Sequence, residues 1–174
     1  MITIITGTNR PSSNSTAVAK LYAKLLDERQ VGNQILDLAN LPADFTTSAL
    51  YENIGTNQAF NDLSALIGES DKFVFIVPEY NGSFPGVLKA FIDGLSYPNT
   101  FRNKKAALVG LSSGVQGSGL AMSHLTDIFN YLGMHVLALK PRLAQIEKNF
   151  DGAAITNELY LGLLKQQIDQ FIHF

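Results

Sequence analysis

The sequence predicts an α/β fold in which a parallel sheet of five strands is covered by helices on both faces. Two observations predict it. Strand and helix patterns alternate along all 174 residues, and the central strands are almost entirely apolar, which is typical of strands buried on both faces. Apolar residues make up 46% of the chain. This length suffices for one hydrophobic core, so we expect a single domain over residues 1–174.

The expected strands are short runs of apolar and β-branched residues that end at glycine, proline or polar residues. The third reads KFVFIV without interruption, and the fifth is expected to end before Pro141. The five strands are expected at residues 2–6, 34–38, 72–77, 106–111 and 134–139.

The expected helices carry apolar residues three and four positions apart, which places those residues on one face. Pro85 is expected at the first position of its helix, where a missing N–H costs nothing, and Gly133 is expected to end the next helix. The five helices are expected at residues 15–28 and 57–67, from Pro85 to about Leu95, around residues 125–132, and around residues 164–172.

The composition excludes several classes of function. There are 13 basic and 15 acidic residues, a net charge of −2, so no basic excess is available for nucleic-acid binding. The absence of cysteine excludes disulfides, thiolate metal sites and cysteine nucleophiles. No apolar run is long enough to predict a membrane span, and the N-terminus lacks a signal-peptide pattern, so a cytoplasmic protein is expected. The low charged fraction of 16% favours an oligomer interface.

The loop after the first strand reads GTNRPSSNST over residues 7–16. Ligands of open parallel sheets bind at the carboxyl ends of the strands. The free N–H groups of the following helix, the hydroxyls and Arg10 suit a phosphate monoester. The alternative is a loop that binds nothing, with Ser13 or Ser15 capping the helix. No nucleotide-binding glycine motif is present, so Asp37 is not favoured as a ribose ligand.

Two further loops are expected at the same edge of the sheet. The loop after the third strand, PEYNGSFPG over residues 78–86, is fixed by its prolines and offers Tyr80 for stacking and Asn81 for hydrogen bonds. The alternatives are a solvated or capping Glu79 and a Tyr80 ring that only covers the sheet edge. The loop after the fourth strand, SSGVQGSG over residues 112–119, is rich in glycine.

Together these loops resemble the NADPH-dependent FMN reductase family of flavodoxin-like proteins, which includes quinone, azo and chromate reductases. The family's first loop runs G-S-x-R-x-x-S-x-N/S, and residues 7–15 match it with Thr8 in place of serine. The second signature, P-E-Y-N-x-S-x-P-G-x-L-K-N-A-I-D, matches PEYNGSFPGVLKAFID at residues 78–93, with Ala90 and Phe91 as departures. The resemblance implies a flavodoxin-like three-layer sandwich with strand order 2-1-3-4-5.

The resemblance also implies a site for FMN. By position it assigns the FMN phosphate to Thr8, Arg10, Ser13 and Ser15, with the backbone N–H of Asn14. It assigns the flavin ring to Pro78, Glu79, Tyr80, Asn81 and Gly82, with Ser113 and Gly114 closing the site. It implies hydride transfer from NAD(P)H through FMN to a small acceptor such as a quinone, a flavin, an azo compound or a metal oxyanion. A homodimer or homotetramer is implied as well.

Flavin chemistry of this kind needs no catalytic side chain. The three histidines lie outside the three loops, so we expect structural or surface roles for them, and the scattered carboxylates predict no metal site. Residues 96–102 match the family's basic stretch only in part, and nothing indicates NADH or NADPH. Two alternatives remain: a flavin-binding electron carrier or redox sensor with little turnover, and a scaffold that has lost the cofactor.

Overall fold

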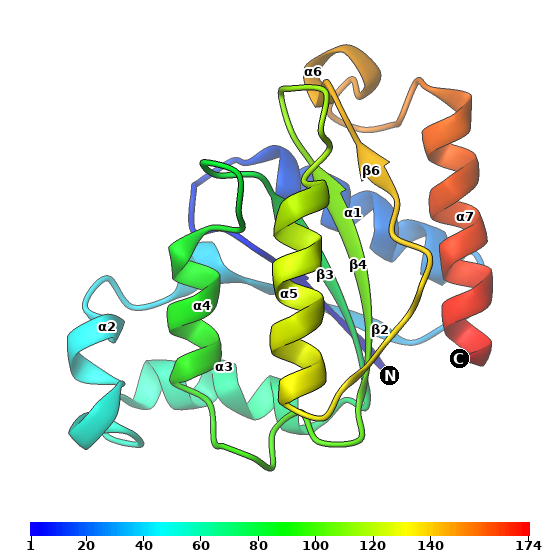
Figure 1. Ribbon diagram of the computed structural model, residues 1–174. Coiled ribbons are helices and arrows are strands. Elements are labelled where there is room, and N and C mark those ends of the chain that lie inside the picture. The colour runs from blue at the N-terminus through cyan, green and yellow to red at the C-terminus, as the bar shows by residue number, and fades with distance from the viewer.

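The computed structural model describes all 174 residues and contains one parallel sheet, whose strands differ in length (Figure 1). The strand order β2-β1-β3-β4-β5 confirms the order implied by the resemblance. A sixth short strand also pairs with β4 in parallel. The strands are β1 (Ile2–Thr6), β2 (Asn33–Asp37), β3 (Lys72–Pro78), β4 (Lys105–Leu111), β5 (His135–Val136) and β6 (Arg142–Leu143).

Helices cover both faces of the sheet, as predicted. In Figure 1, α4 and α5 stand side by side over one face, whereas α1 and α7 lie on the other. The five long helices are α1 (Asn14–Asp27), α3 (Gln58–Gly68), α4 (Gly86–Asp93), α5 (Gly119–Tyr131) and α7 (Glu158–His173). Short helical segments that the sequence patterns did not predict are η1 (Leu38–Asn40), α2 (Phe45–Ser48), η2 (Tyr51–Asn53) and α6 (Ile146–Asn149).

Each face of the sheet has its own hydrophobic core, because side chains alternate between the two faces along a strand. Phe73, Phe75 and Val77 of β3 point into a cluster of 23 buried residues beneath α3, α4 and α5. The rings of Phe75 and Phe129 lie 4.5 Å apart there. Val74 and Ile76 point into a second cluster of 20 buried residues beneath α1 and α7. The all-apolar third strand is therefore buried on both faces, as its sequence predicted.

Two helix starts differ in detail from the predictions. Pro85 is the N-cap of α4, with extended backbone angles of φ −61° and ψ 138°, and the helix begins at Gly86. Of the two candidate caps of α1, Ser13 takes the role, and its Oγ accepts the N–H of Thr16 at 3.2 Å. Ser15 instead lies inside the first turn of α1.

The prediction of a continuous fifth strand at residues 134–139 is wrong. β5 holds only two residues, and the chain pairs with β4 again at β6, beyond Pro141. From Ala106 to Gly110, β4 advances four residues while its partner advances six, from Val136 to Arg142. Two extra residues therefore bulge out of the ladder, and Pro141 has no N–H with which to continue it.

A buried side chain from α7 fills the break in the fifth strand. Gln167 is fully buried, and its Nε2 donates to Leu108 O at 2.9 Å and to Leu139 O at 2.8 Å. These two bonds satisfy carbonyls that a continuous ladder would have paired. The break has a consequence for the site, because β6 leads the chain back to the carboxyl edge of the sheet and into α6. None of the helices is long and apolar enough to cross a membrane.

Candidate functional site

A cavity of about 290 Å³ lies at the carboxyl edge of the sheet. The loops after β1, β3 and β4 meet there, together with the start of α6. Nine of the twelve residues expected at the site line it, whereas Asn81, Gly82 and Gly114 do not. Its fifteen lining residues are Thr8, Arg10, Pro11, Ser12, Ser13, Asn14, Ser15, Pro78, Glu79, Tyr80, Leu111, Ser112, Ser113, Ile146 and Glu147.

The first loop is held tightly against β3. The N–H of Gly7 donates to Ile76 O at 2.8 Å, and a Cβ added to Gly7 would lie 2.8 Å from the same oxygen. Such contacts are too close for any side chain, so glycine is required by the close approach of the two backbones. The loop therefore leaves β1 in contact with β3 and then passes over the cavity.

Thr8 connects the first loop to the second. Its side chain is buried, and its Oγ1 accepts the N–H of Arg10 at 3.2 Å and lies 3.1 Å from Tyr80 Oη. This pair joins residues 72 positions apart. Arg10 itself is exposed at the cavity and forms no salt bridge. The one cationic side chain that lines the cavity thus keeps its charge available for an anion.

The start of α1 presents unsatisfied donors to the cavity. The first N–H groups of a helix have no intrahelical acceptor, and here they belong to Asn14 and Ser15, which line the cavity. Ser15 is 1% exposed, and its buried hydroxyl has no hydrogen-bond partner. A buried hydroxyl without a partner is costly in a folded protein. Its position beside the free N–H groups therefore points to an anionic ligand that satisfies all three.

The second loop forms a tight turn next to the cavity. Tyr80 and Ser83 exchange backbone hydrogen bonds of 2.8 and 3.0 Å, and the two residues between them, Asn81 and Gly82, have φ values of 51° and 75°. Two successive positive φ angles are the geometry of a type I′ turn, which favours Asn-Gly. Asn81 and Gly82, at the tip of this turn, do not line the cavity, whereas Tyr80, 40% exposed, does.

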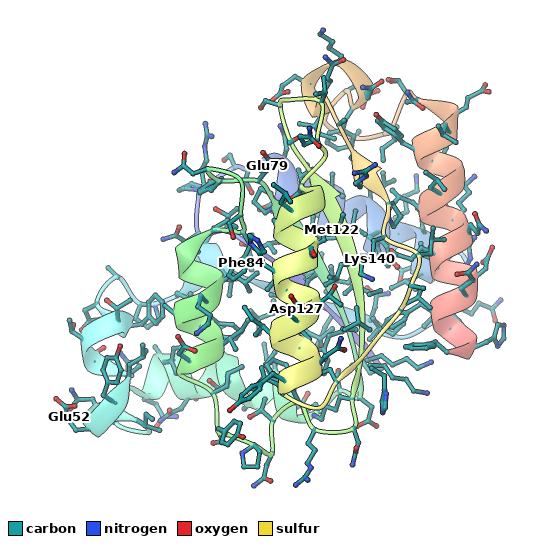
Figure 2. The ribbon with its side chains drawn as sticks, viewed as in Figure 1. Glu52, Glu79, Phe84, Met122, Asp127 and Lys140 are labelled. Carbon is teal, nitrogen blue, oxygen red and sulfur yellow. The ribbon has the colours of Figure 1, made fainter.

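Glu79 ties the second loop to the third. Its backbone N–H donates to Leu111 O at 3.0 Å, and its Oε2 accepts the N–H of Ser118 at 3.1 Å. Figure 2 shows Glu79 near the upper end of α5, and Glu52 far from it at the lower left. The carboxylate of Glu79 is thus a link between loops rather than only a solvated charge.

The third loop is bound to the segment that follows β6. Gln145 N–H donates to Gly114 O at 2.9 Å, and Ile146 N–H donates to Ser112 O at 3.0 Å. The hydroxyl of Ser113 donates to Glu147 Oε1 at 2.6 Å. This hydrogen bond is the main cause that lowers the pKa of the Glu147 carboxyl below its usual range. Glu147 therefore contributes a stable negative charge to the cavity wall.

Sequence reasoning missed six of the lining residues: Pro11, Ser12, Leu111, Ser112, Ile146 and Glu147. Pro11, Ser12 and Ser112 adjoin predicted site residues in the loops, and Leu111 ends β4 two positions before Ser113. Ile146 and Glu147 were missed because no element was expected between the end of the fifth strand, near residue 139, and the last helix, near residue 164. The pair Arg142-Leu143 after Pro141 was the available signal that pairing resumes.

The donor set fits the terminal phosphate of FMN. It comprises an unpaired arginine, the free N–H groups at the start of a 14-residue helix and the unpartnered Ser15 hydroxyl. Hydrogen-bond donors of this kind suit phosphate oxygens, and the helix dipole favours negative charge at that end. The adjoining wall of Pro78, Glu79 and Tyr80 suits a planar ring with polar edges. The residues present therefore fit FMN.

The histidines and carboxylates suggest no other chemistry at this edge. His124 on α5 lies with its Nδ1 2.9 Å from Ser83 Oγ, which supports the turn of the second loop. No group of three or more histidine, cysteine or acidic residues is placed to hold a metal ion.

The sequence model of one family, described as NADPH-dependent FMN reductase, matches residues 1–142. The match covers the first three loops and the whole sheet up to the first residue of β6. It ends before Glu147.

Two curated relatives carry related descriptions. A 2-hydroxy-1,4-benzoquinone reductase from Burkholderia sp is 38% identical over 80 residues, which is 44% of this chain and 43% of that protein. The FMN-dependent NADPH-azoreductase of Staphylococcus aureus is 29% identical over 179 residues, which is 98% of this chain and 93% of that protein.

A solved structure of similar shape is the flavoenzyme NAD(P)H:(acceptor) oxidoreductase from Paracoccus denitrificans. It superposes with a TM-score of 0.81 at 26% identity, covering 99% of this chain and 94% of that one. Fold, loop signatures and family match agree over most of the sequence. The chain therefore belongs to the NADPH-dependent FMN reductase family.

Proposed function

We propose that this protein is an FMN-dependent oxidoreductase that uses NADPH or NADH to reduce a small acceptor, with the FMN phosphate held by the loop between β1 and α1. The observation that carries the proposal is the buried, unpartnered hydroxyl of Ser15 at the start of α1. It lies in one cavity with Arg10 and with the PEYN segment. An anion at this position would satisfy donors that the protein alone leaves unused.

The phosphate end of the site consists of neutral donors and one cation. Ser15, the N–H groups of Asn14 and Ser15, and Arg10 would bind the phosphate oxygens. Thr8 and Ser13 also line the cavity, and their hydroxyls already have partners within the protein. These hydroxyls hold the loop through contacts within the protein and are not free to bind the phosphate.

The ring end of the site consists of the second and third loops. Pro78, Glu79 and Tyr80 would contact the flavin ring from one side, and Ser112 and Ser113 would close the cavity from the other. Asn81, Gly82 and Gly114 do not line the cavity. We propose that they fix the loop backbone rather than contact the ring through side chains.

FMN, when bound, supplies the redox chemistry by accepting hydride from the reduced nicotinamide and passing electrons to the acceptor. The chain binds and orients the reactants, and its backbone N–H groups provide the dipoles that stabilise developing negative charge. None of the lining side chains is a histidine, lysine or cysteine. Because the cofactor carries the redox step, the reaction that we propose uses no side-chain nucleophile.

Quinones and azo compounds are the acceptor classes that we propose first, because relatives are described as a benzoquinone reductase and an azoreductase. Both are flat, conjugated molecules that can lie against an exposed flavin ring. The half-exposed Tyr80 at the rim offers a surface on which such a molecule can stack. We propose a cytoplasmic location, where reduced nicotinamide nucleotides are available.

We further propose that the active form is a homodimer that uses the outer face of α4 and α5, or a tetramer built from such dimers. Tyr97 and Tyr131 are 67% and 79% exposed, and their rings stack with centroids 6.5 Å apart. They border an apolar groove of about 570 Å³ that includes Ile92, Ile128 and Leu132. Exposed aromatic residues of this kind are enriched at protein interfaces.

Anaerobic mixing of the FMN-loaded protein with NADPH tests the proposed function, with the flavin absorbance as the readout. We expect rapid bleaching and recovery of the absorbance when a benzoquinone is added. Slow bleaching by NADPH would favour an electron carrier or sensor with little turnover of its own. A colourless protein that takes up no added FMN would contradict the proposal and leave only the scaffold.

A further inference from the structure

The carboxylate of Asp37 lies at the same edge of the sheet as the first loop. Asp37 ends β2, which pairs with β1 in register so that Asp37 stands opposite Thr6. Its Oδ1 accepts the hydroxyl of Thr6 at 2.6 Å and the N–H of Ala39 at 3.0 Å. Its Oδ2 accepts the hydroxyl of Thr16, in the first turn of α1, at 3.1 Å. One side chain thus joins β1, β2 and α1.

These contacts fix the direction of each hydroxyl in a short chain. A carboxylate only accepts hydrogen bonds, so the single hydroxyl hydrogen of Thr16 is used by Asp37. In the 3.1 Å hydrogen bond between Thr16 Oγ1 and Ser13 Oγ, Ser13 must then be the donor and Thr16 the acceptor. Ser13 Oγ in turn accepts the N–H of Thr16 at 3.2 Å. The hydrogen of Ser13 is therefore directed back into the protein and not into the cavity.

Ser15 contrasts with Ser13. Both line the cavity, but the hydroxyl of Ser15 has no partner and keeps its hydrogen free. The two serines thus differ in what they can offer to a phosphate, although they belong to the same motif. Ser15 can donate a hydrogen bond to it, whereas Ser13 cannot while Asp37 holds Thr16.

We propose that Asp37 is a positioning residue for the cofactor site: through Thr16 it directs the Ser13 hydroxyl inward, and it thereby leaves Ser15, and not Ser13, as the serine of this pair that donates to the FMN phosphate. This inference rests on the proposed function. It gives Asp37 a role at the cofactor site that requires no contact between Asp37 and any ligand.

The substitution Asp37→Asn tests the direction of the hydrogen bonds that link Asp37, Thr16 and Ser13. An asparagine oxygen would replace Oδ1 and still accept from Thr6 and Ala39, while its NH₂ group would replace Oδ2 and donate to Thr16. The Thr16 hydroxyl would then turn toward Ser13, and the hydrogen of Ser13 would become free for the cavity. Ser13 is therefore expected to contribute to phosphate binding only in the Asp37→Asn protein.

The measurement is the ratio of the affinities for FMN and for riboflavin, which lacks the phosphate, obtained from flavin fluorescence during titration of the flavin-free protein. We expect Ser15→Ala to lower this ratio roughly tenfold or more, because a hydrogen bond to a charged group is lost. Ser13→Ala should change it less than about twofold. In the Asp37→Asn background, Ser13→Ala should lower the ratio several-fold. Asp44→Asn, a matched change away from the cavity, should leave the ratio unchanged.

The riboflavin affinity also reports folding, so a variant that merely loses structure will lose both ligands. Equal effects of Ser13→Ala in the wild-type and Asp37→Asn backgrounds would overturn the inference, as would an unchanged ratio in Ser15→Ala. Failure of the proposed function has a different signature, because the wild-type protein would then show no preference for FMN over riboflavin.

Discussion

The hydroxyl of Ser113 donates a hydrogen bond to the carboxylate of Glu147, with 2.6 Å between Oγ and Oε1. This contact joins the glycine-rich third loop to α6 and places a negative charge in the wall of a cavity that we assign to an anionic cofactor. Ser113 also lowers the pKa of Glu147, so the charge persists into mildly acidic solution. At the site that we propose for FMN, Glu147 would therefore repel the phosphate and the negative charge that the flavin gains on reduction.

We expect Glu147→Gln to bind oxidised FMN a few-fold more tightly and reduced FMN more tightly still, because Coulomb repulsion is removed. The midpoint potential of the bound flavin should consequently rise. Titration of the flavin-free protein and a redox titration of the loaded protein measure both effects, and Glu69→Gln at the end of α3 serves as the control. Weaker FMN binding in Glu147→Gln would mean that the carboxylate instead accepts a hydrogen bond from the cofactor.

Arg10 is the one cation that lines the cavity, and it forms no salt bridge within the protein. Arg10→Ala should weaken FMN binding by about 1.5–3 kcal/mol through loss of a charge-assisted hydrogen bond. Isothermal titration with FMN measures the loss, and riboflavin provides the control because its affinity should hardly change. Equal losses of affinity for FMN and for riboflavin would indicate that the phosphate binds away from Arg10.

Gly82 has a φ of 75°, and a Cβ at this position would meet no atom within 4 Å. The glycine is therefore required by the turn and not by crowding. Gly82→Val should destabilise the protein by about 1–3 kcal/mol, whereas Gly82→Asn should cost much less because asparagine tolerates positive φ. Thermal unfolding measures the difference. A loss of flavin affinity that is equally large in the two variants, with normal stability, would instead indicate direct contact between this backbone and the ring.

Tyr22 on α1 is fully buried, and its hydroxyl donates to Gln167 Oε1 at 3.2 Å. Burial raises the pKa of Tyr22 far above its usual value. A raised folded-state pKa gives stability that is complete below the unfolded value, near pH 10, and is lost as the pH rises beyond it. We expect the free energy of unfolding to fall by about 1.4 kcal/mol per pH unit above pH 10 through this group.

Tyr22→Phe isolates that effect. At pH 7 the variant should be less stable by about 1–2 kcal/mol, because Gln167 Oε1 loses its donor. Above pH 10 its stability should decline less steeply than that of the wild type. Lys72, Lys104 and Lys140, whose pKa values are lowered by burial, affect both proteins alike. Urea unfolding between pH 8 and pH 11 tests this, and parallel curves would refute it.

The stacked pair of Tyr97, which follows α4, and Tyr131, at the end of α5, gives a test of assembly. Tyr131→Arg should shift the protein toward monomers, because a charge would be buried in the interface that we propose. Tyr51→Arg is the matched control, since Tyr51 is 76% exposed and lies on η2, away from this face. Sedimentation velocity distinguishes the outcomes. A wild-type monomer, or equal dissociation in both variants, would contradict the assignment of this face.

Most of the fold could be predicted from the sequence, because the patterns that indicate its strands and helices are local. β1 and β3 are continuous apolar runs, and Ser13 and Gly133 mark helix ends. The prediction failed at the fifth strand, where the deciding interaction is tertiary. The two hydrogen bonds from Gln167 that fill the break come from a helix 28 residues beyond Leu139 in the sequence. No periodicity within residues 134–143 reveals such a partner.

The candidate site shows the same difference between residues in local motifs and residues placed by tertiary contacts. Nine lining residues were predicted because they belong to contiguous motifs in the three loops. Glu147 was not predicted, since it reaches the cavity only through the break in the fifth strand and the bonds between α6 and the third loop. The different roles of Ser13 and Ser15 were equally hidden, because they depend on Thr16 and on Asp37 from another strand.

The most direct test of the central claim is a crystal structure of the protein with FMN. We predict that the phosphate lies within hydrogen-bonding distance of Ser15 Oγ and of the first N–H groups of α1, with the ring against Tyr80. A phosphate bound elsewhere, or a crevice closed by its own side chains at saturating FMN, would contradict it.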